Sequence, residues 1–511
     1  MGKGLELQRE LWERVARQAR RLGTAGRPSL WRAVTEFEAS FPDTYRRLER
    51  QRFIERLAST PWLLIGDYHT LPRAQIVASD FVRDYKPACV AFEIIPASKQ
   101  PELDAWAQDD RPAKHLLHEL RFPESWGKLP THGYEMLLET ARAHGCRLLA
   151  VDHPSSADGQ LIDFNEREDW MVDRLGRYAD RPCLALLGDL HLHPQRVPAK
   201  LGDECTVLHQ NHAPYHFALQ EDCEGIPALL QIDSNRYVFQ HTHPLLVEES
   251  CLVALSGENE SHVASPDELL PDLLTRVGAE LDVDAPQVPT VIATFEPDQR
   301  NLLQSLVNDE AKATALLDRL FIQGIAFLEE TGPLVIHLPG SNHLAEAAGK
   351  WLVQQNCPQP ASDAPDKVRL LSSLRLEAAG FVASLLVNPL RRGKSLSWYR
   401  DFLNVEANWK QTGAWHDRLQ ALLDGQSPGL PSNGLPCPEG PAGLVLARIV
   451  GQTLGQQLFG ALQAGSNERQ LALAALFCKL QNPSDVQPAI ELIRRAIAPS
   501  AISMIRGTKS A

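Results

Sequence analysis

The sequence predicts an α/β protein with a mostly parallel sheet flanked by helices, followed by a largely α-helical C-terminal region. Short apolar runs alternate with helical segments through the first half of the chain, and the chain past residue 342 is patterned as helix. Two similar segments, 63–72 and 185–194, each contain an apolar run followed by Gly-Asp-x-His-x-x-Pro. An apolar run that ends at glycine, with proline soon after, is typical of a buried strand that leads into a helix.

The elements follow from this alternation in chain order. Residues 1–57 are expected to be helical, with breaks at Pro28 and Pro42. The expected strands of the alternating part are 62–66, 88–92, 147–151, 183–187 and 205–209, with a further candidate at 237–240. The helices expected between them are 72–84, an excursion that ends near 145, and 163–178. Right-handed crossovers place the ends of such strands along one edge of the sheet.

The length of 511 residues exceeds what a single hydrophobic core accommodates, so several domains are expected. The expected regions are a helical segment (1–57), an α/β domain (58–245), a sheet extension or second small α/β region (246–341) and a helical C-terminal domain (342–511). In the third region, strands at 290–294 and 334–337 flank a helix near 299–329 and either extend the first sheet or begin another. The helical domain contains a Pro/Gly-rich loop at 425–443 and is expected to cover the site or to recruit a protein partner.

Composition excludes several classes of protein. A formal net charge of −13 argues against a general nucleic-acid binder, and no apolar stretch approaches the ~18 residues of a transmembrane segment. The nine cysteines are dispersed without a C-x-x-C pair, which is typical of reduced thiols. Because residues 1–21 also lack the apolar segment of a secretory signal, we expect a cytoplasmic protein.

Polar side chains stand at the ends of four neighbouring expected strands. They are Asp67 and His69, then Glu93, then Asp152 and His153, and finally Asp189, His191 and His193. In open α/β sheets, ligands bind outside the carboxyl ends of the strands. Imidazole and carboxylate groups that converge there can hold a divalent metal, transfer protons or ligate a haem iron. Tyr68 joins the cofactor-binding candidates because tyrosine is a known axial haem ligand.

A polar residue at a strand end is often only a turn former or a helix cap. The repeated Gly-Asp-x-His pattern favours a function for His69 and His191, because a turn alone would accept many residues at the histidine position. Glu93 follows an apolar strand, where an unpaired carboxylate would be costly. Alternation along an extended chain would point His193 the same way as His191 only if the strand continued that far.

A second group of histidines follows the last of these strands. Its members are His209, His212, His216, His241 and His243. Metal or haem binding would explain the enrichment, although polar loops that adjoin a site are the plainer explanation. Templates for a serine nucleophile, a zinc protease or a nucleotide-binding loop are absent from the sequence.

Three short motifs resemble one known superfamily. Gly-Asp-Tyr-His at 66–69, Ala-Phe-Glu at 91–93 and Gly-Asp-Leu-His at 188–191 resemble the superfamily of ChaN-type haem-binding proteins, erythromycin esterases and Tiki/TraB peptidases. The ChaN-type domain is the most similar of these, over about residues 58–245. Its helical insertion resembles the segment from Pro101 through Trp106 and Trp126 to Tyr134–Cys146.

The sequence departs from the ChaN pattern at three points. Asp67 stands where glutamate is usual, Thr70 follows the first histidine where aspartate is usual, and no lipoprotein signal precedes the domain. The first two departures put in doubt any activity that needs the longer carboxylate. The third removes haem uptake at the cell surface as a ready role.

The resemblance implies a protein that binds haem or an iron-like metal in a strand-end cleft, and a role in intracellular iron or haem handling is expected. His69, Glu93 and His191 would contact the ligand, while Asp67, Asp152 and Asp189 would orient them. An alternative is a hydrolase of an ester or amide that uses His69, Glu93 and His191 with a divalent metal or as acid and base. A third alternative is a non-catalytic scaffold.

Overall fold

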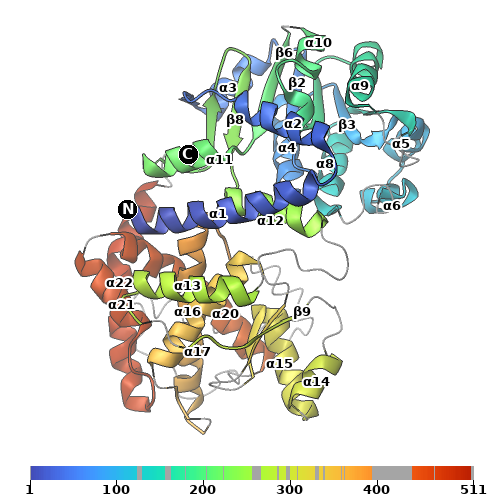
Figure 1. Cartoon of the computed structure of the whole chain (residues 1–511). Coiled ribbons are helices and arrows are strands. Elements are labelled where there is room, and N and C mark those ends of the chain that lie inside the picture. Colours follow the sequence, from blue (N-terminus) through green and yellow to red (C-terminus); the bar gives the residue numbers. More distant parts are fainter. Residues whose placement is uncertain are drawn as a thin grey trace. The chain divides into compact units, whose positions relative to one another are not determined.

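The fold is taken from a computed structural model of the chain. The structure describes residues 2–122, 129–155, 163–178, 180–202, 204–222, 224–255, 266–284, 287–294, 300–307, 309–328, 333–337, 340–357, 359–361, 363–393, 440–464 and 466–507. The chain forms two compact units, Arg9–His262 and Met1–Gln8 with Val263–Ala511 (Figure 1). The predicted fold class is confirmed, since one unit is built on a mostly parallel sheet and the other is largely helical. The four-region division stays a prediction.

The α/β unit contains an eight-stranded sheet in the order β1-β7-β8-β6-β2-β5-β3-β4. In that order the strands are Arg46–Leu48, Ala228–Gln231, Arg236–Gln240, Cys205–Gln210, Trp62–Asp67, Cys183–Gly188, Cys89–Pro96 and Arg147–Asp152. The six strands from β8 to β4 pair in parallel, and β7 pairs antiparallel with both of its neighbours. The carboxyl ends of those six strands therefore lie along one edge, as predicted.

Helices cover both faces of this sheet. They are α1 (Gly2–Gly23, from Arg9 on), α2 (Pro28–Ala39), α3 (Arg50–Leu57), α4 (Pro72–Tyr85), α5 (Gln100–Ala107), α6 (Ala113–Glu119), α8 (His132–Ala143), α9 (Phe164–Tyr178), α10 (Val197–Leu201), α11 (Ala213–Glu221) and α12 (Pro244–Leu255). Short 3-10 turns, η1 (Ala97–Lys99) and η3 (Asp189–Leu192), follow β3 and β5 directly.

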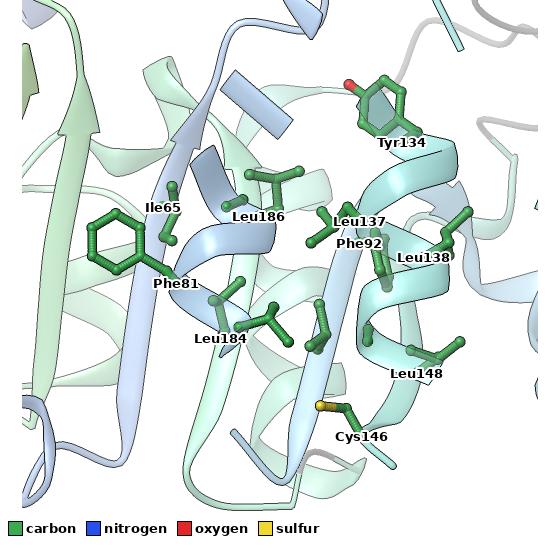
Figure 2. Packing of buried hydrophobic residues seen from close by; sticks show 14 of the residues in the cluster. Ile65, Phe81, Phe92, Tyr134, Leu137, Leu138, Cys146, Leu148, Leu184 and Leu186 are labelled. Atoms are coloured by element: carbon green, nitrogen blue, oxygen red, sulfur yellow. The ribbon is translucent and has the colours of Figure 1, made fainter. Parts of the chain in front are cut away.

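The central strands are buried on both faces, which explains why their sequences are continuous apolar runs. Along β2, Leu63 and Ile65 join one core cluster while Trp62 and Leu64 join another, because successive side chains point to opposite faces. The first cluster packs under α4 and α8. Figure 2 shows part of it, with Leu137 of α8 next to Phe92 of β3.

Two features of this unit differ from the sequence prediction. Residues 46–48, expected to be helical, form the edge strand β1 against β7, a strand that was not predicted. Three residues carry too weak a local pattern to indicate a strand, and their pairing with a strand about 180 residues away decides the outcome. The candidate strand at 237–240 is confirmed as part of β8.

The second unit contains a separate three-stranded sheet in the order β10-β11-β9. Its strands are Ile325–Phe327, Leu334–His337 and Val291–Thr294, so the later predicted strands begin a new sheet. Its helices are α13 (Pro266–Glu280), α14 (Arg300–Val307), α15 (Glu310–Gln323), α16 (Ser341–Asn356), α17 (Asp366–Val387), α20 (Pro441–Gln463), α21 (Ser466–Leu476) and α22 (Val486–Gly507), with the 3-10 turn η4 (Pro483–Asp485) before α22. The single helix expected near 299–329 is thus two helices, the second capped by Asp309. The expected loop 425–443 lies outside the described residues up to 439.

Helices α16, α17 and α20 pack closely because glycine stands at their contacts. A methyl group at Gly349 would lie 2.5 Å from the carbonyl oxygen of Ala379, so no larger residue fits there. Within the described residues one helix, α17, has the length and hydropathy of a membrane span, but 89% of its most apolar window is buried. Such burial is typical of a core helix, so α17 is weak evidence for a membrane segment.

Candidate functional site

Three of the predicted side chains meet where β2, β3 and β5 end. The Nε2 atom of His191 lies 3.2 Å from Oε1 of Glu93. A methyl group at Gly188 would lie 3.1 Å from Nε2 of His69 and 3.3 Å from Oε2 of Glu93. His69, Glu93 and His191 therefore surround the carboxyl end of β5, and glycine is needed there because both side chains approach the backbone closely.

Asp67 fixes the orientation of the His69 ring. Its Oδ2 atom lies 2.8 Å from Nδ1 of His69, and the hydroxyl of Tyr134 donates to the same oxygen at 2.6 Å. Gln75 donates to Oδ1 at 2.5 Å. The carboxylate is thus held from two helices, α4 and α8, and it holds the imidazole with Nε2 towards Gly188. This contact agrees with the orienting role predicted for Asp67.

Neighbouring carboxylates raise the pKa of His69. Burial lowers the pKa of the imidazole, but attraction and a hydrogen bond from Asp67, followed by attraction from Glu93, raise it above its ordinary value. The side chain of His69 keeps 23% of its surface exposed, whereas that of Asp67 keeps 1%. His69 is therefore the member of the group that a ligand can reach.

Glu93 is buried but fully engaged. Its Oε1 atom lies 2.9 Å from Nη2 of Arg167, and the backbone N–H of Gly188 donates to Oε2. Burial raises the pKa of the carboxyl, but His191, Arg167 and His69 together hold it well below its usual range. Glu93 is consequently a charged carboxylate at neutral pH.

His191 lies between two carboxylates. Its Nδ1 atom is 3.0 Å from Oε1 of Glu168, its Nε2 atom faces Glu93, and its ring stacks on Phe164 at 4.6 Å between centroids. Burial lowers its pKa, yet Glu93 and Glu168 outweigh this effect and raise it. Both ring nitrogens face carboxylates and the side chain is 3% exposed, so these surroundings favour the protonated form of His191.

Asp189, predicted as a carboxylate that orients an imidazole, contacts His209, at 3.0 Å between Oδ1 and Nδ1. It also lies over Gly66, where a methyl group would clash at 1.8 Å. Asp189 opens the 3-10 turn η3, and this turn directs Asp189 towards His209 and His191 towards other partners. The carboxylate that contacts Nδ1 of His191 is Glu168 of α9.

Asp152 acts through an arginine. Its two oxygens accept from Nε and Nη2 of Arg167 at 2.6 and 3.0 Å, and Arg167 in turn pairs with Glu93. Asp152, predicted as a residue that orients the ligand-contacting groups, therefore positions the arginine that pairs with Glu93.

Tyr68 and His153 make other contacts. The Tyr68 hydroxyl donates to the carbonyl oxygen of Asn211 at 3.3 Å, and burial raises its pKa well above the usual value, which disfavours a phenolate ligand. Nδ1 of His153 accepts from the backbone N–H of Ser155 at 3.2 Å, and its ring lies against Trp170. Ligand roles for both residues stay predictions.

His193 lies at the end of η3 and accepts from the backbone N–H of Gln195 at 3.2 Å. Burial and nearby Arg196 lower its pKa. Because η3 is a turn, the extended geometry that would have aligned His193 with His191 does not occur.

The second histidine group is packed into the α/β unit. The ring of His212 stacks on Phe41 at 4.1 Å, and the rings of His216 and His243 lie 4.7 Å apart. Burial lowers the pKa of His212 to about 3 and that of His216 to about 4. Burial therefore favours the neutral form of His212 and His216. His209 lies in β6 and His216 in α11, whereas His212, His241 and His243 lie in the connections that follow β6 and β8.

A divalent metal finds no ready set of ligands in the described part of the chain, where no group of three His, Cys, Asp or Glu side chains is arranged to hold an ion. At the strand ends the reason is that Glu93 is already paired with Arg167 and His191. A haem iron needs fewer protein ligands, since one protein nitrogen can ligate it axially. His69, which is oriented by Asp67 and partly exposed, can supply that nitrogen.

Several residues of this site were missed from the sequence. They are Gln75, Tyr134, Arg167, Glu168 and His209 as the partner of Asp189. One signal was present, because Glu168 shares a helix face with Met171 and Leu175, which are both buried. A carboxylate on the apolar face of a helix indicates a buried cationic partner.

Comparison with known proteins supports the resemblance seen in the motifs. Residues 53–161 match the model of a family described as haem-binding uptake, Tiki superfamily, ChaN. Among solved structures, one titled "Cofacial heme binding to ChaN of Campylobacter jejuni" matches with 14% sequence identity over 38% of this chain and 92% of that chain, at a TM-score of 0.29. A search of the curated proteins finds none that matches. The predicted resemblance is therefore confirmed for residues 53–161, which include β2, α4, β3 and α8.

Proposed function

We propose that the α/β unit, whose residues 53–161 match the ChaN-type haem-binding family, binds haem through His69 at the carboxyl ends of β2 and β5. The observation that carries the proposal is the Asp67–His69 pair. A carboxylate on Nδ1 fixes the tautomer that leaves Nε2 as the ligating nitrogen, and it increases the basicity of the ring.

The other two predicted ligands take a different part in this proposal. The side chains of Glu93 and His191 are only 2% and 3% exposed and are committed to each other, to Arg167 and to Glu168. They form a rigid charged layer behind His69 and do not contact the ligand directly. Haem, when bound, would supply a redox-active iron whose potential depends on its axial ligand and surroundings.

A role in intracellular iron or haem handling is the physiological part of the proposal. It is supported by the family match and by the lack of a ready site for a bare divalent ion in the described residues. A cytoplasmic location and a protein partner for the helical unit remain expectations of the same proposal.

Titration with haem tests the proposal. Addition of haem to the purified full chain should produce a Soret band that shifts from the position of free haem, and His69→Ala should abolish the shift. His144→Ala is the matched control, because His144 is an exposed histidine of the same unit and bonds only locally to its own helix. Asp67→Asn should weaken binding by roughly 10–100-fold through loss of the orienting carboxylate.

The outcome that contradicts the proposal is a His69→Ala protein that is folded by circular dichroism and binds haem like the wild type. If the wild type and His144→Ala bind haem but the haem spectrum does not change in any variant, the haem binds at a site other than His69. Equal loss in His69→Ala and His144→Ala would indicate nonspecific association.

A hydrolase is the second candidate, and the same Asp67–His69 pair favours it. A carboxylate-oriented imidazole with an accessible Nε2 is also the arrangement of a general base. A panel of activated esters and amides, assayed with wild type, His69→Ala and His144→Ala, separates the candidates. Turnover that is lost in His69→Ala, without a haem spectrum, would favour the hydrolase, and inactivity of every variant in both assays would favour a scaffold.

A further inference from the structure

Cysteines line the opposite edge of the sheet from the candidate site. Cys89, Cys183 and Cys205 are the first residues of β3, β5 and β6, and all three are free and buried. In the parallel register of β3 and β5, Cys89 stands directly opposite Cys183. Both side chains belong to the same core cluster, so they point to the same face of the sheet.

This register brings the two thiols within reach of each other. Opposed residues of neighbouring strands are separated by about 4.8 Å, which lies inside the Cα separation of about 4.4–6.8 Å that disulfides span. Cys205, in contrast, stands opposite Trp62, which stands opposite Cys183, so a whole strand separates it from the pair.

A fourth cysteine, Cys146, shows that two thiols near each other along the sheet can still lie on opposite faces of it. Cys146 directly precedes β4, next to Cys89 along the sheet, but it packs into the core cluster on the other face. Cys89 and Cys183 are therefore the two thiols of this edge that share strand register and sheet face.

The two thiols differ in reactivity. The hydrogen bond from Cys183 lowers the pKa of Cys89 despite burial, and a backbone hydrogen bond at Asp180 and the charge of Arg147 act in the same direction. Burial and the shared hydrogen bond raise the pKa of Cys183. Because the thiolate is the reactive form, Cys89 is the member of this buried pair that reaches that form more readily.

We propose that Cys89 and Cys183 form a redox pair that a peroxide converts into a cross-strand disulfide. The Cys89 thiolate displaces hydroxide from hydrogen peroxide and becomes a sulfenic acid, and the hydroxide takes up a proton to leave as water. The Cys183 sulfur then attacks the Cys89 sulfur, forming the S–S bond as a second water leaves. A dithiol reductant reverses the reaction by exchange.

The two cysteines lie on the same two strands as residues of the candidate site, so the redox state of the pair can affect that site. β3 carries Glu93 and β5 carries Gly188, whose N–H donates to Glu93 at the other end of the same two strands. A disulfide would change the spacing at the amino ends of these strands, since the two sulfurs must approach to about 2.05 Å. The proposal does not depend on haem binding.

Thiol mapping of the full chain tests this proposal. The reduced protein is exposed to hydrogen peroxide, unfolded, alkylated and digested for mass spectrometry. We expect a peptide that joins residues 89 and 183, a loss of two titratable thiols per chain, and full recovery with dithiothreitol. Cys205→Ser is the matched control and should form the same cross-link, because Cys205 lies on the same edge and face but stands opposite Trp62.

Two variants complete the test. Cys89→Ser should show no cross-link, and Cys183→Ser should accumulate a sulfenic acid at Cys89 that dimedone traps. The proposal is overturned if Cys89 and Cys183 stay fully alkylatable in oxidised wild type, or if Cys89 is found joined to Cys146 or Cys205. Circular dichroism of each variant establishes that it is folded.

Discussion

Arg167→Met should destabilise the α/β unit strongly. Arg167 is the cation shared by Glu93 and Asp152, whose side chains are 2% and 0% exposed. Methionine keeps much of the apolar stem of the side chain but leaves the two buried carboxylates without the guanidinium. Glu93 retains His191, whereas Asp152 loses its bidentate partner.

The expected magnitude follows from burial. Removal of one partner from a buried ion pair costs about 3–5 kcal/mol, and we expect about 3 kcal/mol because Arg167 itself keeps 20% of its side chain exposed. Arg177→Met on the same helix is the matched control. Arg177 pairs with Asp173 at the surface, with side chains 68% and 44% exposed, so its loss should cost at most about 0.5 kcal/mol.

The difference between wild type and Arg167→Met should also depend on pH. The pKa of Glu93 is held well below its usual range, so its ionised form adds stability above the unfolded pKa of about 4.3, and this stability is lost as pH falls through the folded pKa. Loss of Arg167 weakens that depression. The destabilisation should therefore be largest above about pH 5 and should shrink at lower pH.

Urea titration with pulsed hydrogen exchange measures this effect. Mass spectrometry of peptides that cover β3 and β4 reports unfolding of the α/β unit separately from the helical unit. A cost of less than about 1 kcal/mol at pH 7, similar to that of Arg177→Met, would refute the assignment of Arg167 as the buried counter-ion. A cost that stays constant from pH 7 to pH 3 would refute the role of Glu93 in it.

Two further predictions concern the same strand ends. Gly66→Ala should destabilise the unit by about 1–3 kcal/mol in thermal unfolding, because the new methyl group would lie 1.8 Å from Asp189. Gly176→Ala, where no atom lies within 4 Å of the added methyl group, should be neutral or stabilising. Equal effects of the two substitutions would contradict the close approach of Asp189 to Gly66. Stability from charged His191 should be complete below its unfolded pKa of about 6.5 and fall as pH rises through its raised folded pKa. His191→Gln should flatten that dependence, and a histidine NMR titration that finds the pKa of His191 below 6.5 would contradict its position between Glu93 and Glu168.

The segments that form buried strands, and the edge of the sheet where their polar residues lie, were predictable from local pattern. Continuous apolar runs identify buried strands, and Gly-Asp-x-His marks where β2 and β5 end, so His69, Glu93 and His191 could be placed at one edge of a parallel sheet. The edge strand β1 could not be predicted, because three residues gain their conformation from β7 far along the chain.

The contacts between side chains within the site could be predicted from the local sequence only where the two residues are close along the chain. The sequence gives Asp67 and His69 two residues apart on one strand end, and their contact follows from that proximity. Arg167 and Glu168, in contrast, reach Glu93 and His191 only because α9 packs against the sheet next to β4. Which carboxylate orients which imidazole depends on the turn η3, and a single turn of backbone decides it.

The sequence by itself determined the α/β class, the edge of the sheet that carries the polar groups and three of the side chains that meet there. The tertiary structure alone decided that His69 is the reachable group while Glu93 and His191 are held as a buried ion pair. The physical reason is that hydrophobic periodicity is a property of neighbouring residues, whereas exposure, charge state and hydrogen-bond partner are set by elements that come together only when the chain folds.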